Sequence, residues 1–283
     1  MLRTGNLIPF TKMKKIKIIL LIAVIAFANM RCTEKENTID QHVNMDSIAI
    51  KAIAKKEKKD TTKRYVYLTI DDVPGNGSAY VDSIILSQKV KTNLFLVGHD
   101  VDGSKRFLKY YEAFRKNPHV EIYNHSYTHA NNRYAAYYKN PESVLNDFEK
   151  NRTNFNITHK IARLPGRNLW LIGEQKKNCR QTGSSSAELL AKNGYKIFGW
   201  DVEWKYNFKN YTPKQNVDEL VKEIENLCNT SNTFTRKQIV LLVHNQMFRK
   251  VNEKNNLREL IEKLKEKEFS FEYLSSYTSL SSD

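Results

Sequence analysis

Residues 65–72 read YVYLTIDD, a short run of β-branched and aromatic side chains that ends in two carboxylates. Similar runs, typical of β-strands, occupy residues 93–97, 120–123, 161–163, 196–200, 239–243 and 269–273. Between them lie segments with the apolar spacing of helices, for example residues 81–89 and 217–227. About seven alternations of strand and helix predict an α/β fold with a parallel sheet, either an open doubly wound sheet or a barrel.

Composition is that of a folded protein. The chain has 283 residues, 40% of them hydrophobic, which argues against wholesale disorder. Three cysteines without a C-x-x-C pair exclude a disulfide scaffold and a cysteine zinc knuckle. The net charge is 46 − 31 = +15, and six of these positive charges lie in residues 1–31. The remaining excess is compatible with an anionic substrate or membrane surface but is more typical of a solvated, Lys-rich exterior, and we expect no nucleic-acid partner.

Residues 1–31 have the features of an export signal, with Met13 as an alternative start. A basic segment precedes the apolar run 18–28, which is shorter than the roughly 20 residues that a membrane-spanning helix needs. Cys32 follows in a position that resembles the lipidated cysteine of bacterial lipoproteins, although residues 29–31 lack the small side chains expected there. Lipidation of Cys32, which would tether the protein to a membrane, and ordinary cleavage nearby both stay open. In either case we expect an exported protein in the periplasm or cell envelope.

Two regions follow the signal. Residues 32–63 have little hydrophobic periodicity and include a charge run, so we expect a flexible tether there. Residues 64–283 then form one α/β domain, which we expect to be a monomer. Cys179 and Cys228 could pair outside the cytoplasm, but a sequence does not establish the geometry that a disulfide needs.

Ionisable side chains follow five of the predicted strands. Because parallel α/β folds place their chemistry at the carboxyl ends of strands, these groups should converge on one rim. The convergence predicts a functional site there. The residues are Asp71, Asp72, His125, His129, Arg163, Asp201, Glu203 and His244.

Three of these side chains predict a metal site. The i, i+4 spacing puts His125 and His129 on one side of a helical turn, where both imidazoles can reach one ion. Asp72 at a neighbouring strand end supplies a carboxylate. Two imidazoles, one carboxylate and an open position suit catalytic Zn²⁺, although Co²⁺, Ni²⁺ or Fe²⁺ fits the same ligands.

The adjacent carboxylates of Asp71 and Asp72 predict two different chemical roles. If the backbone stays extended, the two side chains cannot point the same way. One can then bind the metal while the other takes a proton from water. The alternative is that a strand-end aspartate caps the next helix, which explains one carboxylate better than two.

These motifs together resemble the polysaccharide deacetylase family, also called the NodB homology domain or carbohydrate esterase family 4. The resemblance extends from about residue 65 to residue 273, and the order of the motifs along the chain makes it specific. Residues 69–75 (TIDDVPG) resemble T-F-D-D-G-P, residues 91–98 (KTNLFLVG) resemble K-A-T-F-F-V-x-G, residues 125–129 (HSYTH) fit H-[ST]-x-x-H, and residues 242–244 (LVH) fit L-x-H.

The resemblance implies a distorted (β/α) barrel and metal-dependent removal of acetyl groups from sugars. Asp71 would be the general base, and Arg163 would orient it through a charged hydrogen bond. His244 would protonate the leaving group. A backbone N–H just after the Arg-x-Pro segment would help to stabilise the oxyanion. The metal ligands would be Asp72, His125 and His129.

The Arg-x-Pro segment departs from the family pattern. Pro165 is followed by Gly166 and Arg167 instead of the usual aromatic residue. The Gly166 N–H can still donate, but the substrate wall is altered, and we expect Arg167 to address a negative group on the substrate. Residues 168–186 are interpreted as a long loop over the rim.

The family's D-x-x-D-W motif is one residue shorter here, as DVEW in residues 201–204. The register is therefore ambiguous, and either Asp201 or Glu203 would hold His244 in its working tautomer. Asp201 is favoured. Trp204 would line the acetyl pocket, with a core tryptophan as the alternative.

The leading hypothesis is an exported, metal-dependent deacetylase that acts on N-acetyl or O-acetyl groups of a carbohydrate polymer or oligosaccharide. A second hypothesis is a glycan-binding lipoprotein that keeps the barrel without the chemistry, which the departures at Gly166 and Glu203 motivate. A third is a barrel hydrolase that cuts other C–N bonds of small amides. Peptidoglycan, chitin-like oligomers, acetylated xylan and surface polysaccharides all remain candidate substrates.

Overall fold

The computed structural model describes residues 59–250 and 252–278, so the predicted signal and residues 32–58 of the predicted tether lie outside the described residues. Residues from Lys59 onward belong to one compact unit. This unit begins before the predicted boundary at residue 64, because the last tether residues contact the domain: the Nζ of Lys237 donates to the Thr61 carbonyl at 3.1 Å. Within the described ranges, no helix combines the length and apolarity that crossing a membrane requires.

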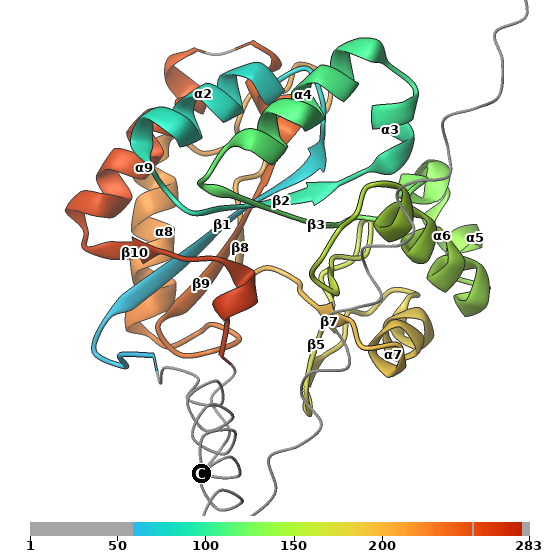
Figure 1. Cartoon of the computed structure of the whole chain (residues 1–283). Coiled ribbons are helices and arrows are strands. Elements are labelled where there is room, and N and C mark those ends of the chain that lie inside the picture. The colour runs from blue at the N-terminus through green and yellow to red at the C-terminus, as the bar shows by residue number, and fades with distance from the viewer. Residues whose placement is uncertain (1–58, 251, 279–283) are drawn as a thin grey trace, which may run out of the picture. The chain divides into compact units, whose positions relative to one another are not determined.

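The domain is built on one curled sheet, which forms a half-barrel (Figure 1). Its strand order is β6-β5-β7-β4-β3-β2-β1-β9-β8, and β10 pairs with β1 beside β2. The predicted α/β fold of the distorted-barrel type is therefore confirmed. The strands are β1 (Arg64–Val73), β2 (Thr92–Leu96), β3 (Val120–Asn124), β4 (Ile161–Ala162), β5 (Trp170–Ile172), β6 (Gln175–Lys177), β7 (Lys196–Ile197), β8 (Val202–Glu203), β9 (Gln238–His244) and β10 (Phe269–Phe271).

Helices cover the outer face of the sheet. Figure 1 shows α2, α4, α8 and α9 gathered around β1, β2 and β9, and α6 and α7 beside the β5 and β7 end. The α-helices are α2 (Ser78–Gln88), α3 (Gly98–Asp102), α4 (Lys105–Lys116), α5 (Tyr134–Tyr137), α6 (Pro141–Asn154), α7 (Ser184–Lys192), α8 (Val217–Asn229) and α9 (Leu257–Glu266). The 3₁₀ helices are η1 (His129–Asn132), η2 (Asn245–Arg249), η3 (Glu253–Asn255) and η4 (Leu274–Ser276).

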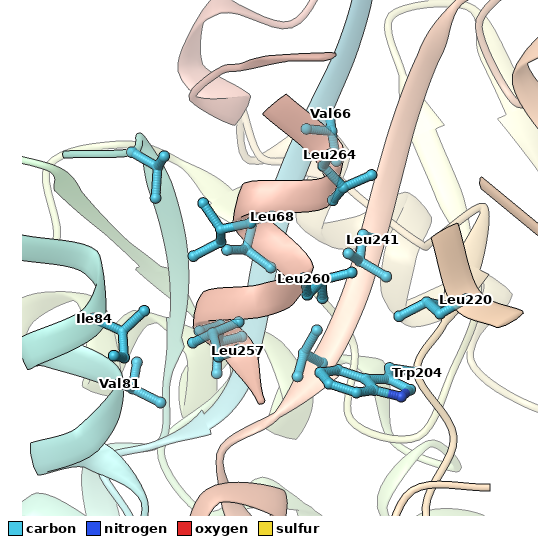
Figure 2. Close-up of a cluster of buried hydrophobic side chains, with 14 of the residues drawn as sticks. Val66, Leu68, Val81, Ile84, Trp204, Leu220, Leu241, Leu257, Leu260 and Leu264 are labelled. Carbon is cyan, nitrogen blue, oxygen red and sulfur yellow. The ribbon is translucent and has the colours of Figure 1, made fainter. Parts of the chain in front are cut away.

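Alternation along β1 separates the core from the barrel interior. Successive side chains of a strand point to opposite faces. Val66, Leu68 and Ile70 belong to the apolar cluster between the sheet and the helices, where Leu257, Leu260 and Leu264 of α9 pack. Figure 2 shows this packing.

The other face of β1 lines the barrel interior. Tyr65 and Tyr67 join a second, largely aromatic cluster with Phe95 and Trp170. Further along the strand, this face carries Thr69 and then Asp71, both buried. The interior thus changes from aromatic to polar toward the carboxyl end of β1, which is where the chemistry was predicted.

The segment interpreted as a loop over the rim is instead part of the sheet. β5 and β6 form an antiparallel hairpin, and β5 also pairs antiparallel with β7, so the sheet is mixed where about seven parallel strands were predicted. Trp170 is fully buried and stacks on Phe234, with ring centroids 4.3 Å apart. Three-residue strands are too short to show an alternation pattern, and for this reason the hairpin could not be predicted.

The two cysteines of the domain are not paired. Cys228 is buried in the helix-facing cluster, whereas Cys179 packs at the edge of a different cluster, formed with α6 and α7.

The apolar contact between β1 and α9 should be a main source of stability. Leu260→Ala should lower the free energy of unfolding by about 2–5 kcal/mol, because the side chain is fully buried and its loss leaves a cavity. Leu86→Ala is the matched control: Leu86 lies on α2 with half of its surface exposed, so its loss should cost less than about 0.5 kcal/mol. Urea denaturation of the two variants measures the difference, and equal losses would contradict this description of the core.

Candidate metal centre and active site

The carboxyl ends of neighbouring strands bring the predicted residues together. Asp71 on β1 pairs in register with His244 on β9, and Leu96 on β2 pairs with Asn124 on β3. His125 directly follows β3, and its backbone N–H donates to the Leu96 carbonyl at 3.0 Å. Residues that are far apart in sequence thus share one edge of the sheet.

Both carboxylates of the Asp-Asp pair reach the same site, because the backbone does not stay extended. The register of β1 shifts between Ile70 and Val73, and Asp72 adopts a left-handed conformation with φ of 58°. The nearest carboxylate oxygens of Asp71 and Asp72 each lie 3.6 Å from Nε2 of His125. A β-bulge of this kind re-aims a side chain, and here it removes the alternation that the sequence predicts.

The two histidines also converge, but not through a helical turn. Ser126 and His129 have φ values of 64° and 49°, and the chain continues into η1 with left-handed residues. The His129 N–H donates to Oγ of Ser126 at 3.0 Å, which fixes the turn. The i, i+4 spacing therefore brings the two imidazoles together through an irregular turn. The helical turn that the sequence predicted at this position is wrong.

Asp72, His125 and His129 form a group that could hold a metal ion, since one candidate ligand atom from each lies within 4.8 Å of the others. Oδ1 of Asp72 is buried and accepts no hydrogen bond of ordinary geometry, although Nε2 of His129 lies 3.2 Å away. Nδ1 of His125 lies 2.8 Å from the Arg163 carbonyl, so it carries the proton and Nε2 keeps its lone pair. An orphaned carboxylate oxygen facing imidazole nitrogens fits a divalent cation.

The electrostatics of this group are strongly coupled. Burial alone would raise the pKa of Asp72, but His129, His244 and His125 outweigh it and hold that pKa well below its usual value. Burial lowers the pKa of His125, only partly opposed by Asp71. Burial also acts to lower the pKa of His129, but Asp72 outweighs it and raises that pKa. An ionised carboxylate beside a neutral His125 is the charge state that a cation requires.

Arg163 holds Asp71 from inside the barrel. Its side chain is fully buried, and Nη1 donates to Oδ1 of Asp71 at 2.7 Å and to Oγ1 of Thr69 at 2.8 Å. Nε and Nη2 donate to the carbonyls of Phe198 and Gly199. Because Oδ1 of Asp71 is bonded to the guanidinium, Oδ2 is the oxygen left facing the histidine side of the site.

His244 lies beside Glu203, not Asp201. Oε1 of Glu203 is 3.9 Å from Nδ1 of His244, a buried atom that has no hydrogen-bond partner. Asp201 instead accepts backbone N–H groups of Phe234 at 2.7 Å and Val240 at 2.8 Å. Burial raises the pKa of Asp201 to about 6, although these two bonds act in the opposite direction. The structure therefore favours Glu203 as the partner of His244, against the sequence-based preference for Asp201.

The structure does not place Arg167 where it could meet a substrate. Its side chain is buried and donates to the carbonyls of Thr182 and Gly166. Gly166 has φ of 65°, and a Cβ built on it would lie 3.2 Å from the ring of Tyr134. That ring also contacts His129 edge-on, with centroids 5.9 Å apart. Tyr134, from α5, thus occupies the space beside Gly166 where the family usually has an aromatic residue.

Trp204 is a core residue. Its side chain is fully buried among the helix-facing apolar residues, it packs on Phe248, and its Nε1 donates to the Gln215 carbonyl at 3.1 Å. It does not line the acetyl pocket as expected, because the residue after β8 turns its ring toward the helices.

A polar pocket of about 440 Å³ adjoins Asp72 and His129. Sequence reasoning missed the residues around this opening, including His99 and Asp100 of α3, the helix that follows β2. It also missed Tyr206, which is not part of the pocket wall but follows β8, with its ring 5.3 Å from that of His244. Extending the strand-end rule to these two loops would have found them. The remaining residues of the pocket wall are Val97, Thr128, Asn131, Asn132 and Gln246.

Comparisons with known proteins show which family this chain resembles. The family model described as polysaccharide deacetylase matches residues 58–168. The peptidoglycan-N-acetylglucosamine deacetylase of Bacillus cereus is 24% identical over 245 residues, covering 84% of this chain and 80% of that protein.

Solved structures share the fold. The polysaccharide deacetylase Bc1974 from Bacillus cereus superposes with a TM-score of 0.55 and 24% identity, covering 78% of this chain and 97% of that chain. BA3943 of Bacillus anthracis, described as a CE4 family pseudoenzyme, has a TM-score of 0.53 and 18% identity, covering 76% of this chain and 66% of that one. The matched family model and the curated relatives assign this chain to the polysaccharide deacetylase family, and the solved structures show that it shares the fold of carbohydrate esterase family 4.

Proposed function

We propose that the protein is an exported, metal-dependent deacetylase that hydrolyses acetyl groups on a carbohydrate polymer or oligosaccharide. The observation that carries the proposal is the group of Asp72, His125 and His129 with the second carboxylate of Asp71 beside it. A stability role alone explains neither the orphaned oxygen of Asp72 nor the presence of a buried carboxylate, Asp71, next to a partly buried one at the same strand end.

Asp72, His125 and His129 would hold the ion, with Zn²⁺ as the proposed metal and Co²⁺, Ni²⁺ or Fe²⁺ as alternatives. When bound, a divalent cation polarises the acetyl carbonyl and makes water more acidic. The Arg163 carbonyl keeps the His125 imidazole in the tautomer that leaves Nε2 available.

Asp71 acts as the general base. The hydrogen bond from Arg163 to Oδ1 fixes the orientation of the carboxylate, so that Oδ2 can accept the proton of the attacking water. The guanidinium cannot itself take the proton, because it is already protonated and has no acceptor atom.

His244 acts as the general acid and Gly166 as an oxyanion donor. His244 gives a proton to the nitrogen or oxygen of the sugar as its bond to the acetyl carbon breaks. Glu203 steadies the imidazole from the Nδ1 side. The backbone N–H of Gly166, an exposed residue, stabilises the negative charge on the acetyl oxygen.

A glycan-binding protein without turnover is the second candidate. It is favoured by one observation: the family includes the structurally similar BA3943, described as a pseudoenzyme. Against it, this chain retains a full set of metal ligands and both proton-transfer groups, Asp71 and His244.

The metal site predicts one bound divalent ion per chain. Isothermal titration of Zn²⁺ into chelator-treated protein should give a stoichiometry near one, and Asp72→Asn should weaken binding by about tenfold or more. Asp218→Asn, the same substitution on the exposed surface of α8, should bind like the unaltered protein. Equal affinity in the two variants would remove Asp72 from the metal site.

Activity should follow the ion and Asp71. The purified protein should release acetate from acetylated oligosaccharides or chromogenic acetyl esters, lose this activity with a chelator and regain it with Zn²⁺ or Co²⁺. Asp71→Asn should lower kcat by about 10²–10⁴-fold, because Asn cannot accept the proton. Its Zn²⁺ affinity, measured in parallel, separates loss of the base from loss of the ion. Unchanged turnover in Asp71→Asn would contradict the assignment of the base.

The two carboxylates near His244 should behave differently. Glu203→Gln should lower kcat by roughly tenfold with an unchanged melting temperature, because it weakens only the support of the general acid. Asp201→Asn should instead destabilise the protein by about 1–3 kcal/mol, because an amide nitrogen would face a backbone N–H. Kinetics and thermal melts of the pair test this, and the reverse pattern would restore Asp201 as the orienting residue.

A further inference from the structure

The chain between β8 and α8 forms a short ordered turn beside His244. Tyr206 and Pro213 make an antiparallel bridge. The Asn207 N–H donates to the Thr212 carbonyl and the Lys214 N–H donates to the Lys205 carbonyl, each at 2.8 Å. These bonds hold the tip of the turn in place, so a side chain there has a defined position relative to the site.

Phe208, at this tip, is 75% exposed. Single exposed apolar residues are common, so exposure alone indicates nothing. The other two large apolar side chains that are exposed in the described part of the chain, Leu86 and Leu108, lie on the outer helices α2 and α4. Phe208 differs from them because its ring is connected to the active site.

A row of aromatic rings leads from His244 to the surface. The Tyr206 ring lies 5.3 Å from the His244 ring, and the Phe208 ring lies 4.9 Å from Tyr206. Tyr211 stacks on Tyr206 at 6.1 Å with an interplanar angle of 20°, and the Arg249 guanidinium covers the Tyr211 ring at 4.7 Å. Packing from behind therefore fixes Tyr206 and leaves Phe208 open to solvent.

The general acid marks the side of the site on which the sugar lies. His244 donates its proton to the atom that joins the acetyl group to the sugar, so the sugar must extend outward from His244. The aromatic rings that lie next to His244 are Tyr206 and, beyond it, Phe208. The faces of pyranose rings carry C–H groups, which pack favourably on the electron-rich face of an aromatic ring.

We propose that Phe208, supported by the buried ring of Tyr206, forms a stacking platform for the carbohydrate chain and contacts the sugar next to the acetylated one. The platform selects substrates of two or more sugars over a monosaccharide. This inference rests on the proposed function, because it takes the direction of the sugar from the role of His244.

The test compares Phe208→Ala, Phe208→Trp and Leu108→Ala. Leu108→Ala removes an exposed apolar side chain from α4 and is the matched control. The probes are chitotetraose, a tetramer of β-1,4-linked N-acetylglucosamine, and the N-acetylglucosamine monomer. Affinity is measured by isothermal titration on chelator-treated protein, so binding is read without turnover, and KM and kcat are measured on the Zn²⁺-loaded protein.

Phe208→Ala should weaken chitotetraose binding by about five- to tenfold, which corresponds to about 1–1.4 kcal/mol, within the usual contribution of one aromatic contact. The loss should appear in KM more than in kcat, and the ratio of tetramer to monomer affinity should fall. Phe208→Trp should restore tetramer affinity, since a larger ring keeps the stacking face. Leu108→Ala should match the unaltered protein.

Three results would overturn the platform: unaltered tetramer affinity in Phe208→Ala, equal losses for monomer and tetramer, or no binding of chitotetraose by the unaltered protein. Failure of the proposed function has a different signature. In that case no acetate is released from any substrate, while chitotetraose still binds through Phe208. Because Phe208 is exposed, its substitution leaves the core intact, and a thermal melt checks this.

Discussion

The buried guanidinium of Arg163 is the constraint on which the site depends. A buried charge is strongly destabilising unless it is paired and its donors are satisfied. Asp71 supplies the opposite charge, and Thr69 and the carbonyls of Phe198 and Gly199 accept three further hydrogen bonds. The centroid of the Phe95 ring lies 4.3 Å from the guanidinium carbon. The inward face of β1 and the ends of β4 and β7 therefore depend on one another. Each supplies a group that stabilises the buried charge of Arg163.

Arg163 also connects the two chemical functions of the site. Its side chain holds Asp71, while its backbone carbonyl meets Nδ1 of His125 at 2.8 Å. The orientation of the proposed base and the tautomer of a proposed metal ligand thus follow from the position of one residue at the end of β4. This connection explains why the spare carboxylate lies beside the metal group: β4 and β1 cannot shift against each other without breaking one of these bonds.

The sequence was sufficient to predict the fold class and the clustering of the strand-end residues, since both depend on long-range regularities that composition and alternation reveal. The sequence was insufficient where the local backbone conformation determines the direction of a side chain. The left-handed conformation of Asp72 turns a carboxylate that alternation would direct elsewhere, and the irregular turn at Ser126 replaces the expected helix. Arg167 and Trp204 were predicted to meet substrate because they follow site motifs, but burial depends on what packs from other elements, namely the Thr182 segment and the α8 region.

The choice between Asp201 and Glu203 shows why motif length matters less than strand pairing. Val202 and Glu203 of β8 pair with Leu241 and Leu242 of β9, so Glu203 lies only two residues short of His244 along the neighbouring strand and on the same face as it. Asp201 precedes β8 and meets the N-terminal part of β9, where the Val240 N–H needs an acceptor. Backbone N–H donors therefore compensate the cost of burying the Asp201 carboxylate, which has no cationic partner within hydrogen-bond distance among the described residues. Its role is to stabilise the structure. A carboxylate used in this way cannot also turn toward His244, and Glu203 is left as the carboxylate that can orient the His244 imidazole.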